Sequence, residues 1–411
     1  MKDYRLRAAL RAGHWPTLVG AWLHLTVSFM VWVLFGALVV PIGAELGLTS
    51  TQASTLVGVP LLSGALTRIV AGWACDWYGA KRTGFLVLGL QVAAVSGAAL
   101  AGTSYAELIV IGFMLGAGGA SFAVAMPLAS RAYPAAHQGL VLGLVASGNV
   151  GTVLVLFLVP RWEALLGWRG ACEVMLLPLL LTGCLFGAFV REEPRLHVQF
   201  MSRGVWWQAA WEMIRVPSVY WLCWIYGITF GGFIGLISYL PLLLHDRYGS
   251  DPIVAGSVAA LCGLTGSLIR PVGGYVADRC GSLRVLVGMF VVLASMSLLA
   301  AFLPALAWAM ATLVLLVAVM GLGNGVIFQI VSEWFPRDIG LASGLVGAAG
   351  GIGGFLVPIW FGLLRERTGS FMSGFVGLAL ISTAAALTVS PALRGHKRRL
   401  AQAANAGGFS H

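Results

Sequence analysis

The sequence predicts an all-α membrane protein whose twelve transmembrane helices form two pseudo-symmetric six-helix bundles. Three observations lead to this fold class. Hydrophobic residues make up 59% of the 411 residues and charged residues only 10%, whereas soluble domains carry roughly 25% charged residues. The apolar residues form long blocks, and each block is long enough for a helix to cross a hydrocarbon core, which takes about 20 residues. Finally, a pattern in the first half of the chain recurs in the second half.

The apolar blocks, read between charged residues, predict twelve helices. A transmembrane β-barrel would instead show segments of about ten residues with alternating polarity, and the blocks lack that alternation. The 55 glycines fit a membrane bundle, because small residues let helix backbones approach closely. The predicted spans cover about residues 17–41, 52–75, 83–102, 106–131, 138–160, 169–190, 217–244, 253–277, 284–303, 306–332, 339–364 and 370–392.

An internal repeat relates the two halves of the chain. Five residues of the second predicted helix and its loop are repeated 202 residues later, in the eighth helix and its loop. The first copy is Gly64, Arg68, Gly72, Asp76 and Gly79, and the second copy is Gly266, Arg270, Gly274, Asp278 and Gly281. Because both copies run in the same direction across the membrane, we expect parallel repeats related by an axis along the membrane normal.

The predicted domains are an N-terminal half (1–190), a linker (191–216), a C-terminal half (217–393) and a tail (394–411). Residues 205–214 of the linker are amphipathic and are expected to lie on the inner membrane surface. The polar tail, rich in small residues, is expected to be disordered. Most of the 25 Lys and Arg residues fall on the side that holds both termini. The positive-inside rule therefore predicts a multi-pass protein of the cell inner membrane, embedded in the lipid bilayer with both termini in the cytoplasm.

Composition and motifs argue against several other function classes. The six cysteines form no CxxC pair, so we predict neither a disulfide framework nor a metal site. The formal charge of +10 is not gathered in one tract with interleaved aromatics, so no nucleic-acid partner is expected. No nucleophile–base pair or HExxH motif suggests an enzyme. We expect no cofactor, and we expect the protein to work as a monomer.

Two arginines deep in the apolar blocks are the main candidates for binding. Arg68 and Arg270 each lie eight residues before a loop aspartate, which places them roughly 12 Å inside the membrane. A central arginine costs about 3 kcal/mol to insert and usually faces a cavity or a partner. The 15 carboxylates all fall near helix ends or in loops, so a bound anion is the expected counter-charge. Structural arginines bonded to backbone carbonyls are the alternative. The planar guanidinium suits a planar oxyanion such as nitrate or a carboxylate.

The loops that follow these two helices resemble a known signature. The segments GWACDWYGAKR (72–82) and GGYVADRCGSLR (273–284) are similar to the cytoplasmic loop signature of the major facilitator superfamily. In that family the aspartate and the basic side chains latch neighbouring helices on the inner face. A solvated polar turn is the alternative reading. The resemblance implies a gating role for Asp76, Lys81, Arg82, Asp278 and Arg284.

Further motifs resemble the bacterial nitrate/nitrite porters within that superfamily. The similarity spans nearly the whole chain apart from the tail, and two glycine-rich stretches resemble the paired nitrate signatures of these porters. The motifs are LTVSFMVWVLFGAL (25–38), the stretches at 116–152 and 321–355, and YGITFGGFIG (226–235).

The resemblance assigns roles to single residues. It implies that Arg68 and Arg270 clamp the anion and that Phe122 and Phe328 sandwich it between aromatic rings. It also implies that a helix-seven tyrosine and a helix-five asparagine lie at the ligand. Without these motifs, each phenylalanine would be read as ordinary core packing. The tyrosine and asparagine are Tyr226 and Asn149.

The implied function is a secondary active transporter of nitrate, nitrite or both, working by alternating access. Because the spans hold no buried carboxylate, nitrate/nitrite exchange is favoured over nitrate/proton symport. His24, the one histidine inside a predicted span, is expected to be a core residue rather than a proton relay. A carrier of formate or oxalate with the same fold remains an alternative, and a channel is disfavoured by the repeated loop pattern.

Overall fold

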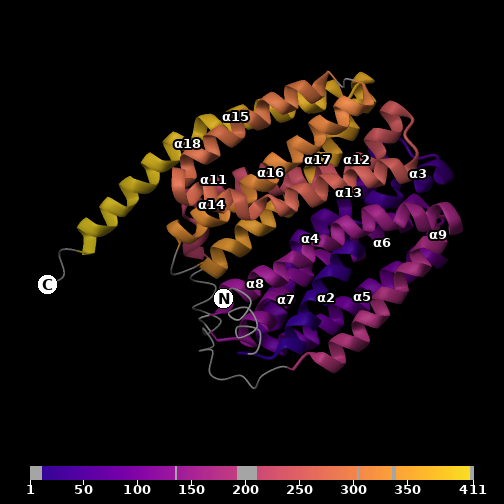
Figure 1. Ribbon diagram of the computed structural model, residues 1–411, viewed down its shortest axis with the longest axis horizontal. Coiled ribbons are helices and arrows are strands. Elements are labelled where there is room, and N and C mark those ends of the chain that lie inside the picture. The colour runs from indigo at the N-terminus through magenta and orange to yellow at the C-terminus, as the bar shows by residue number, and fades with distance from the viewer. Residues whose placement is uncertain (1–11, 135–136, 192–210, 303–304, 336–338, 408–411) are drawn as a thin grey trace, which may run out of the picture.

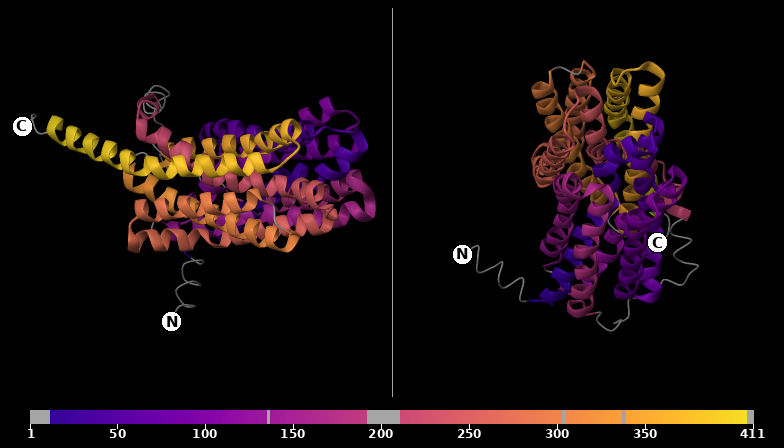
Figure 2. Two further views of the ribbon diagram at one scale, coloured as in Figure 1. Left: turned by 90° about the horizontal axis from the view of Figure 1, so that it is seen from above. Right: turned by 90° about the vertical axis from the view of Figure 1, so that its right-hand side faces the viewer.

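The computed structural model is a bundle of long helices that lie side by side (Figure 1). It describes residues 12–134, 137–191, 211–302, 305–335 and 339–407. Every regular element in these ranges is helical. The first half of the chain forms one group of helices and the second half another, stacked on it (Figures 1 and 2). The fold class predicted from the sequence is therefore confirmed.

Glycines and a capping box mark several helix ends in the N-terminal half. Gly116 ends α6, and a left-handed Gly47 (φ 60°) ends α3. Thr49 and Gln52 form a capping box that begins α4, which satisfies backbone donors that the first turn would otherwise leave unpaired. The helices are α2 (Trp15–Trp32), α3 (Leu34–Leu46), α4 (Ser50–Tyr78), α5 (Ala80–Leu100), α6 (Tyr105–Leu115), α7 (Ala117–Arg131), α8 (Gln138–Ala146), the 3₁₀ turn η2 (Ser147–Asn149) and α9 (Val150–Phe189).

The C-terminal half repeats this plan with one local departure. Between α11 and α12 the chain forms a π-helical segment, η3 (Gly227–Gly231), which widens the helix by one residue per turn. The repeat extends to backbone conformation, because Gly79 (φ 94°) and Gly281 (φ 89°) make equivalent turns. The other helices are α11 (Pro217–Tyr226), α12 (Gly232–Tyr248), α13 (Pro252–Leu268), α14 (Arg270–Cys280), α15 (Ser282–Ala301), α16 (Leu306–Trp334), α17 (Ile339–Thr368) and α18 (Met372–Gly407).

Twelve membrane crossings fit these helices. Eleven helical stretches of the described chain are long and apolar enough to span a membrane. One of them, Val141–Phe189, contains 49 residues, and the 40 residues of α9 alone would extend about 60 Å, twice the roughly 30 Å of a hydrocarbon core. Gly167 interrupts α9 with φ 71° and ψ 170°. The long stretch therefore makes two crossings that turn at Gly167, in agreement with the twelve predicted spans.

The tail differs from the sequence expectation, and the linker lies largely outside the described residues. Helix α18 continues to Gly407, whereas the tail from residue 394 was expected to be disordered. The Ala-rich composition after residue 400 explains the difference, because alanine extends an existing helix at little cost. The expected amphipathic linker piece, 205–214, lies largely outside the described residues, since 192–210 are not among them.

The bundle has two distinct ends. The end where α2 begins and from which α18 projects is called the terminal end, and it lies toward the left of Figure 1. The opposite end, where α3 meets α4 and where α9 turns, is called the distal end. The loops with Gly79 and Gly281 belong to the terminal end, because α4 and α14 both run toward it from the distal half.

The two halves make close contact along the distal part of α4 and α17. At the distal end the backbone N–H of Thr51 donates to the Glu366 carboxylate at 3.1 Å. Farther in, Gly351 lies against Ala65, where a Cβ at Gly351 would be 2.6 Å from the alanine methyl. Nearer the terminal end, a Cβ at Gly344 would meet nothing within 4 Å. The α4–α17 seam is therefore closed distally and open toward the terminal end.

A second seam between the halves, formed by α9 and α13, follows the same pattern. Arg161 donates from Nη2 to Ser257 Oγ at 3.0 Å near the distal end, and Gly263 lies against Val153 in the middle of the seam. Toward the terminal end α13 is followed by α14, where a Cβ at Gly274 would meet nothing within 4 Å. Both seams thus describe a conformation that is closed at the distal end and open at the terminal end.

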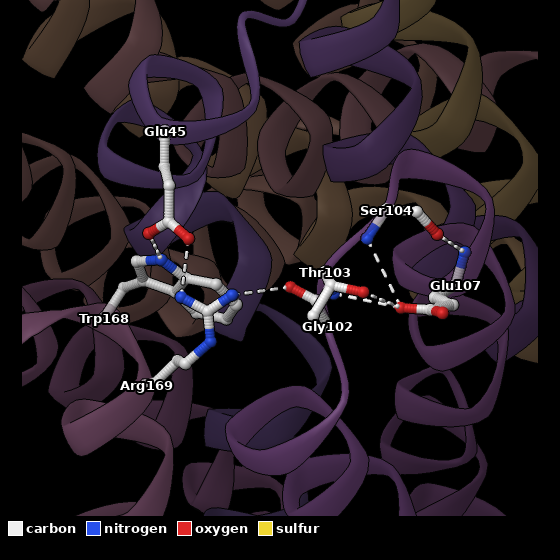
Figure 3. Close-up of polar contacts among 7 residues, drawn as sticks. All are labelled: Glu45, Gly102, Thr103, Ser104, Glu107, Trp168 and Arg169. Atoms are coloured by element: carbon white, nitrogen blue, oxygen red, sulfur yellow. Dashed lines mark hydrogen bonds and ion pairs between the residues drawn. The ribbon is translucent and has the colours of Figure 1, made fainter.

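A polar cluster holds the distal end of the N-terminal half together (Figure 3). The Glu45 carboxylate of α3 accepts hydrogen bonds from Trp168 Nε1 at 2.5 Å and from Arg169 Nη1 at 2.6 Å, both on α9. Arg169 also donates from Nη2 to the Gly102 carbonyl at 2.9 Å, in the turn between α5 and α6. These contacts join three parts of one half and none of the other, so they favour its movement as a rigid unit.

Candidate functional site

Arg68, on the inner face of α4, is only partly satisfied by the protein. Its Nε and Nη2 donate to the Gly119 carbonyl of α7 at 3.2 and 3.0 Å. Its Cζ lies 5.4 Å from the centre of the Phe122 ring, one turn farther along α7. The remaining nitrogen, Nη1, points toward α17 of the other half, where a Cβ at Gly347 would lie 3.3 Å away. One edge of the guanidinium therefore stays open between the two halves.

Arg270, the first residue of α14, is less satisfied than Arg68. Its Cζ lies 4.9 Å from the Phe233 ring centre and 5.5 Å from the Phe230 ring centre. Its Nε and Nη2 are buried and have no hydrogen-bond partner among the described residues. Buried donors without partners are rare in proteins and usually mark a ligand or an ordered water. Arg270 thus presents an open pair of donors next to two aromatic rings.

Tyr226 links the two arginines. It is buried at the end of α11, directly before the π segment η3, a type of distortion that occurs frequently at functional sites. Its ring stacks on Phe230 at 5.2 Å and meets Phe328 edge-on at 5.1 Å. The centre of the Phe230 ring in turn lies 5.5 Å from Arg270 Cζ. On the other side, Gly350 of α17 lies against the Tyr226 ring, and Gly347, one turn earlier on α17, lies against Nη1 of Arg68. Arg68 and Arg270, from different halves of the chain, therefore face one common region.

Asn149 lies at the seam between the halves. It ends the 3₁₀ turn η2, and its Nδ2 donates to Ser267 Oγ of α13 at 2.8 Å. Ser267 is three residues before Arg270, so this bond fixes the stretch that leads to the arginine. Phe328 is 36% exposed, which places a large aromatic face at the edge of the open terminal side.

The glycines of α17 make room for the site. A Cβ at Gly350 would lie 2.7 Å from Cε1 of Tyr226 and 2.8 Å from Cδ1 of Phe230. Any side chain at this position would therefore displace the stacked pair. The same helix passes Arg68 at Gly347. Helix α17 can thus approach the aromatic pair and the N-terminal arginine together because it carries no side chains at these two points.

The residues expected to act in gating lie at the terminal end, and their contacts stay within each half. Asp76 forms an ion pair with Arg131 at 3.5 Å, and Asp278 accepts a hydrogen bond from Gln329 at 2.5 Å. Lys81 donates to the Gly187 and Val190 carbonyls at 2.9 and 2.6 Å, where it caps the end of α9. Arg82 and Arg284 are exposed.

Several residues near the two arginines were not identified from the sequence. Phe230 and Phe233 flank Arg270, and Ser267 pairs with Asn149. Asn324 is a buried amide without a hydrogen-bond partner in the described part of the chain. Phe230 and Phe233 stand inside the quoted motif of residues 226–235, at spacings of four and seven from Tyr226. That spacing puts them on the tyrosine's face of the helix. The spacing is therefore the sequence feature from which Phe230 and Phe233 could be identified as neighbours of the site.

No acidic side chain of the described chain lies beside the two arginines. The ion pairs found in the described part of the chain all lie at helix ends; they are Arg131–Asp76, Arg169–Glu45 and Arg365–Asp246. His24 is fully buried, with Nε2 3.2 Å from the Gly84 carbonyl and its ring 4.8 Å from that of Phe186. Chemically, the region offers open guanidinium donors, a tyrosine hydroxyl and aromatic faces, which together suit a small planar anion.

Known proteins resemble this chain over nearly its whole length. The profile of the Major Facilitator Superfamily matches residues 21–358 and 251–408. The nitrite extrusion protein of Bacillus subtilis is 30% identical, covering 93% of this chain and 97% of that protein. The probable nitrate/nitrite transporter NarK2 of Mycobacterium tuberculosis is 31% identical, with 89% and 92% covered. The probable nitrate/nitrite antiporter NarK1 of Thermus thermophilus is 30% identical, with 88% and 87% covered.

Solved structures share the fold at low sequence identity. The D-xylose–proton symporter superposes with a TM-score of 0.72 at 18% identity, covering 91% of this chain and 97% of that one. A bacterial homolog of the human lysosomal transporter Spinster, inward-facing and occupied, gives 0.73 at 17% identity, with 92% and 96% covered. The chain is a multi-pass membrane transporter that belongs to the Major Facilitator Superfamily and, within it, to the family of the nitrate and nitrite porters.

Proposed function

We propose that this protein carries nitrate and nitrite across the cell inner membrane by alternating access, exchanging one anion for the other. The observation that carries the proposal is the pair of arginines from opposite halves that flank the Tyr226–Phe230 pair and α17 and have no acidic partner among the described residues. A fixed positive charge in low dielectric is costly unless a counter-charge offsets it. A bound monoanion would supply that counter-charge in the middle of the bundle.

The chemistry of the surrounding residues supports a flat oxyanion. The guanidinium offers a planar fork of donors, while Phe122 beside Arg68 and Phe328 beside Tyr226 supply aromatic faces from the two halves. Three relatives named above are described as nitrite or nitrate/nitrite transporters. Binding between two separately packed halves would let the anion be reached from each side in turn.

The same reasoning extends to orientation and to the gating residues. The basic terminal end would face the cytoplasm by the positive-inside rule, so the described conformation would be open to the cytoplasm. In the reverse conformation the terminal end would close, and Asp76, Lys81, Arg82, Asp278 and Arg284 would form the inner latch. The protein would do this as a monomer in the bilayer, because each half contributes one arginine to the site.

Exchange is favoured because the described spans offer no carboxylate near the site to carry a proton. An empty carrier would keep its two cations uncompensated while both ends are closed, and it would therefore return slowly. An anion bound on the far side would speed that return. Proton symport predicts the opposite behaviour, in which a proton gradient drives nitrate into anion-free vesicles.

The test is counterflow in proteoliposomes at matched membrane potential. Nitrite loaded inside should stimulate the initial uptake of labelled nitrate several-fold over empty vesicles, and a pH gradient alone should have little effect. Strong uptake into empty vesicles under an inward proton gradient would replace exchange with symport. Equal stimulation by internal formate or oxalate, together with their direct uptake, would instead establish a carrier of small carboxylates.

A further inference from the structure

Asn324 of α16 is a buried amide that the fold does not use. Its side chain is 2% exposed, and neither Oδ1 nor Nδ2 has a hydrogen-bond partner among the described residues. Burying an amide without partners costs free energy, because it loses its hydrogen bonds to water. A group of this kind in the centre of a transporter points to a ligand rather than to packing.

The repeat shows what is unusual about this position. Counted from the glycines Gly116 and Gly321 that begin the two equivalent stretches, Asn324 corresponds to Gly119. In the N-terminal half the Gly119 carbonyl accepts from Nε and Nη2 of Arg68. In the C-terminal half the same two nitrogens of Arg270 have no partner within the described ranges. The C-terminal half therefore combines an open guanidinium edge with an open amide.

The packing of α16 shows where the amide points. Gly323 lies against Met289 of α15 and Thr229 of η3, and Gly325 lies against the backbone carbonyl of Arg270. Successive helical residues point about 100° apart, so Asn324 is directed between η3 and α14. Phe328, four residues later and on the same face, contacts Tyr226. The Arg270 guanidinium lies over two aromatic rings in that same interhelical space.

We propose that Asn324 is a further specificity-determining residue of the anion site. Its Nδ2–H donates to an oxygen of the anion that Arg270 holds through Nε and Nη2. This inference rests on the proposed function and names the donor set of the C-terminal half. An amide adds a directional donor without adding charge, so it distinguishes an oxyanion such as nitrate from a spherical halide, which the arginines alone attract equally through their charge.

The experiment measures anion binding to the purified full-length protein by isothermal titration calorimetry, with sodium nitrate and sodium chloride as the two probes. Asn324→Gly gives the C-terminal half the residue that the N-terminal half has at the equivalent position. We expect it to bind nitrate about ten- to hundredfold more weakly, with chloride binding unchanged. Asn324→Asp should abolish nitrate binding, because its carboxylate would pair with Arg270 in place of the anion.

Gln91→Met is the matched control. Gln91 is also a fully buried amide, and its Oε1 lacks a partner among the residues that the structure describes. It lies on α5, however, and its Nε2 donates to Ser28 Oγ within the N-terminal half. The nitrate affinity of the Gln91→Met variant should equal that of the unmodified protein. If Asn324→Gly shows no cooperative melting transition, Asn324→Ala, which retains more of the helix propensity, provides the same comparison.

The possible outcomes separate the two hypotheses. Unmodified protein that binds no nitrate at all would contradict the proposed function itself. Unmodified protein that binds nitrate, together with a folded Asn324→Gly variant of equal affinity, would overturn only the role of Asn324. A parallel loss of nitrate and chloride binding in Asn324→Gly would also overturn it, because that result indicates a collapsed site rather than a lost donor.

Discussion

At the scale of single residues, the two arginines differ in how much of their hydrogen-bonding capacity the protein uses. Arg68 gives two of its nitrogens to the Gly119 carbonyl, so only its other edge is available. Arg270 keeps Nε and Nη2 open. A ligand with two oxygens in one plane can accept from both nitrogens of that open edge, which a single point charge on lysine cannot reproduce.

This geometry leads to a prediction for the two arginines. Arg68→Lys and Arg270→Lys should each abolish nitrate transport while leaving the protein folded, because lysine keeps the charge and loses the planar fork. Initial uptake of labelled nitrate and the thermal melting temperature in detergent would be measured for each variant. Near-normal uptake by either lysine variant would contradict the clamp.

The sequence was informative about residues that stand in a repeat or a motif and silent about the rest. Arg68 and Arg270 could be located because a charge in an apolar span is conspicuous and because it occurs twice. The roles of Phe122, Phe328, Tyr226 and Asn149 remain predictions that came only from resemblance. Asn324 could not be identified, because its significance depends on lacking a partner, and only the packed structure shows which groups lack one.

At the scale of single elements, the glycines of α17 are as important as the residues they approach. A Cβ at Gly350 would lie 2.7 Å from Tyr226 and 2.8 Å from Phe230. At Gly344, six residues earlier on the same helix, a Cβ would meet nothing within 4 Å. The two positions therefore separate the effect of packing at the site from the effect of helix propensity alone.

We predict that Gly350→Ala reduces nitrate affinity about ten- to hundredfold. The added methyl group would overpack the site, which costs about 1–3 kcal/mol, and a shift of the Tyr226 ring would have to relieve the clash. Gly344→Ala should leave affinity unchanged. Nitrate titrations of both purified variants would provide the measurement, with the melting temperature as a check on folding. Equal nitrate affinities for the two variants would show that nitrate binding does not depend on the position of the Tyr226 ring.

Helix existence was easier to predict than helix continuity. The twelve spans were readable from block length, but a sequence pattern cannot tell a turn from a helical connection when the connecting residues are themselves helix formers. Around Gly167 the helix-forming residues of α9 run directly into the turn, which is marked in the backbone by the φ of 71° at Gly167. At Val33 a helix with no polar interruption breaks into α2 and α3.

At the scale of the whole molecule, the distal seam sets the balance between the two conformations. The Glu366 carboxylate accepts the Thr51 N–H at the beginning of α4, where the positive end of the helix dipole strengthens the contact. The bond joins opposite halves. Glu107 accepts hydrogen bonds from Thr103 and Ser104 at the beginning of α6 (Figure 3), but all of its partners belong to its own half.

We predict that Glu366→Gln increases the population open at the distal end by about two- to fivefold, and that Glu107→Gln does not. The neutral amide loses the charge–dipole attraction while it keeps nearly the same shape. Spin labels at the exposed distal residues Leu165 and Phe302, one in each half, would allow the distance between the two halves to be measured by pulsed electron paramagnetic resonance. Identical distance distributions for the two variants would remove Glu366 from the distal gate.

The contact between Arg68 and Gly119 has a consequence for biosynthesis. Helix α4 belongs to the least hydropathic span of the described chain, with a mean hydropathy of 1.5, and its central arginine adds about 3 kcal/mol to the cost of insertion. The carbonyl that satisfies this arginine is supplied by α7, which leaves the ribosome later. We therefore expect α4 to enter the bilayer inefficiently until α7 has been synthesised.

Glycosylation mapping of nascent chains in microsomes would measure this dependence. Chains ending after α5 should integrate α4 less often than chains ending after α7, whereas Arg68→Leu chains should integrate it equally at both lengths. A wild-type α4 that inserts fully in the shorter chains would contradict the expectation. The arginine that leaves one edge open for a ligand in the finished transporter would thus make the insertion of its own helix depend on a helix translated more than 35 residues later.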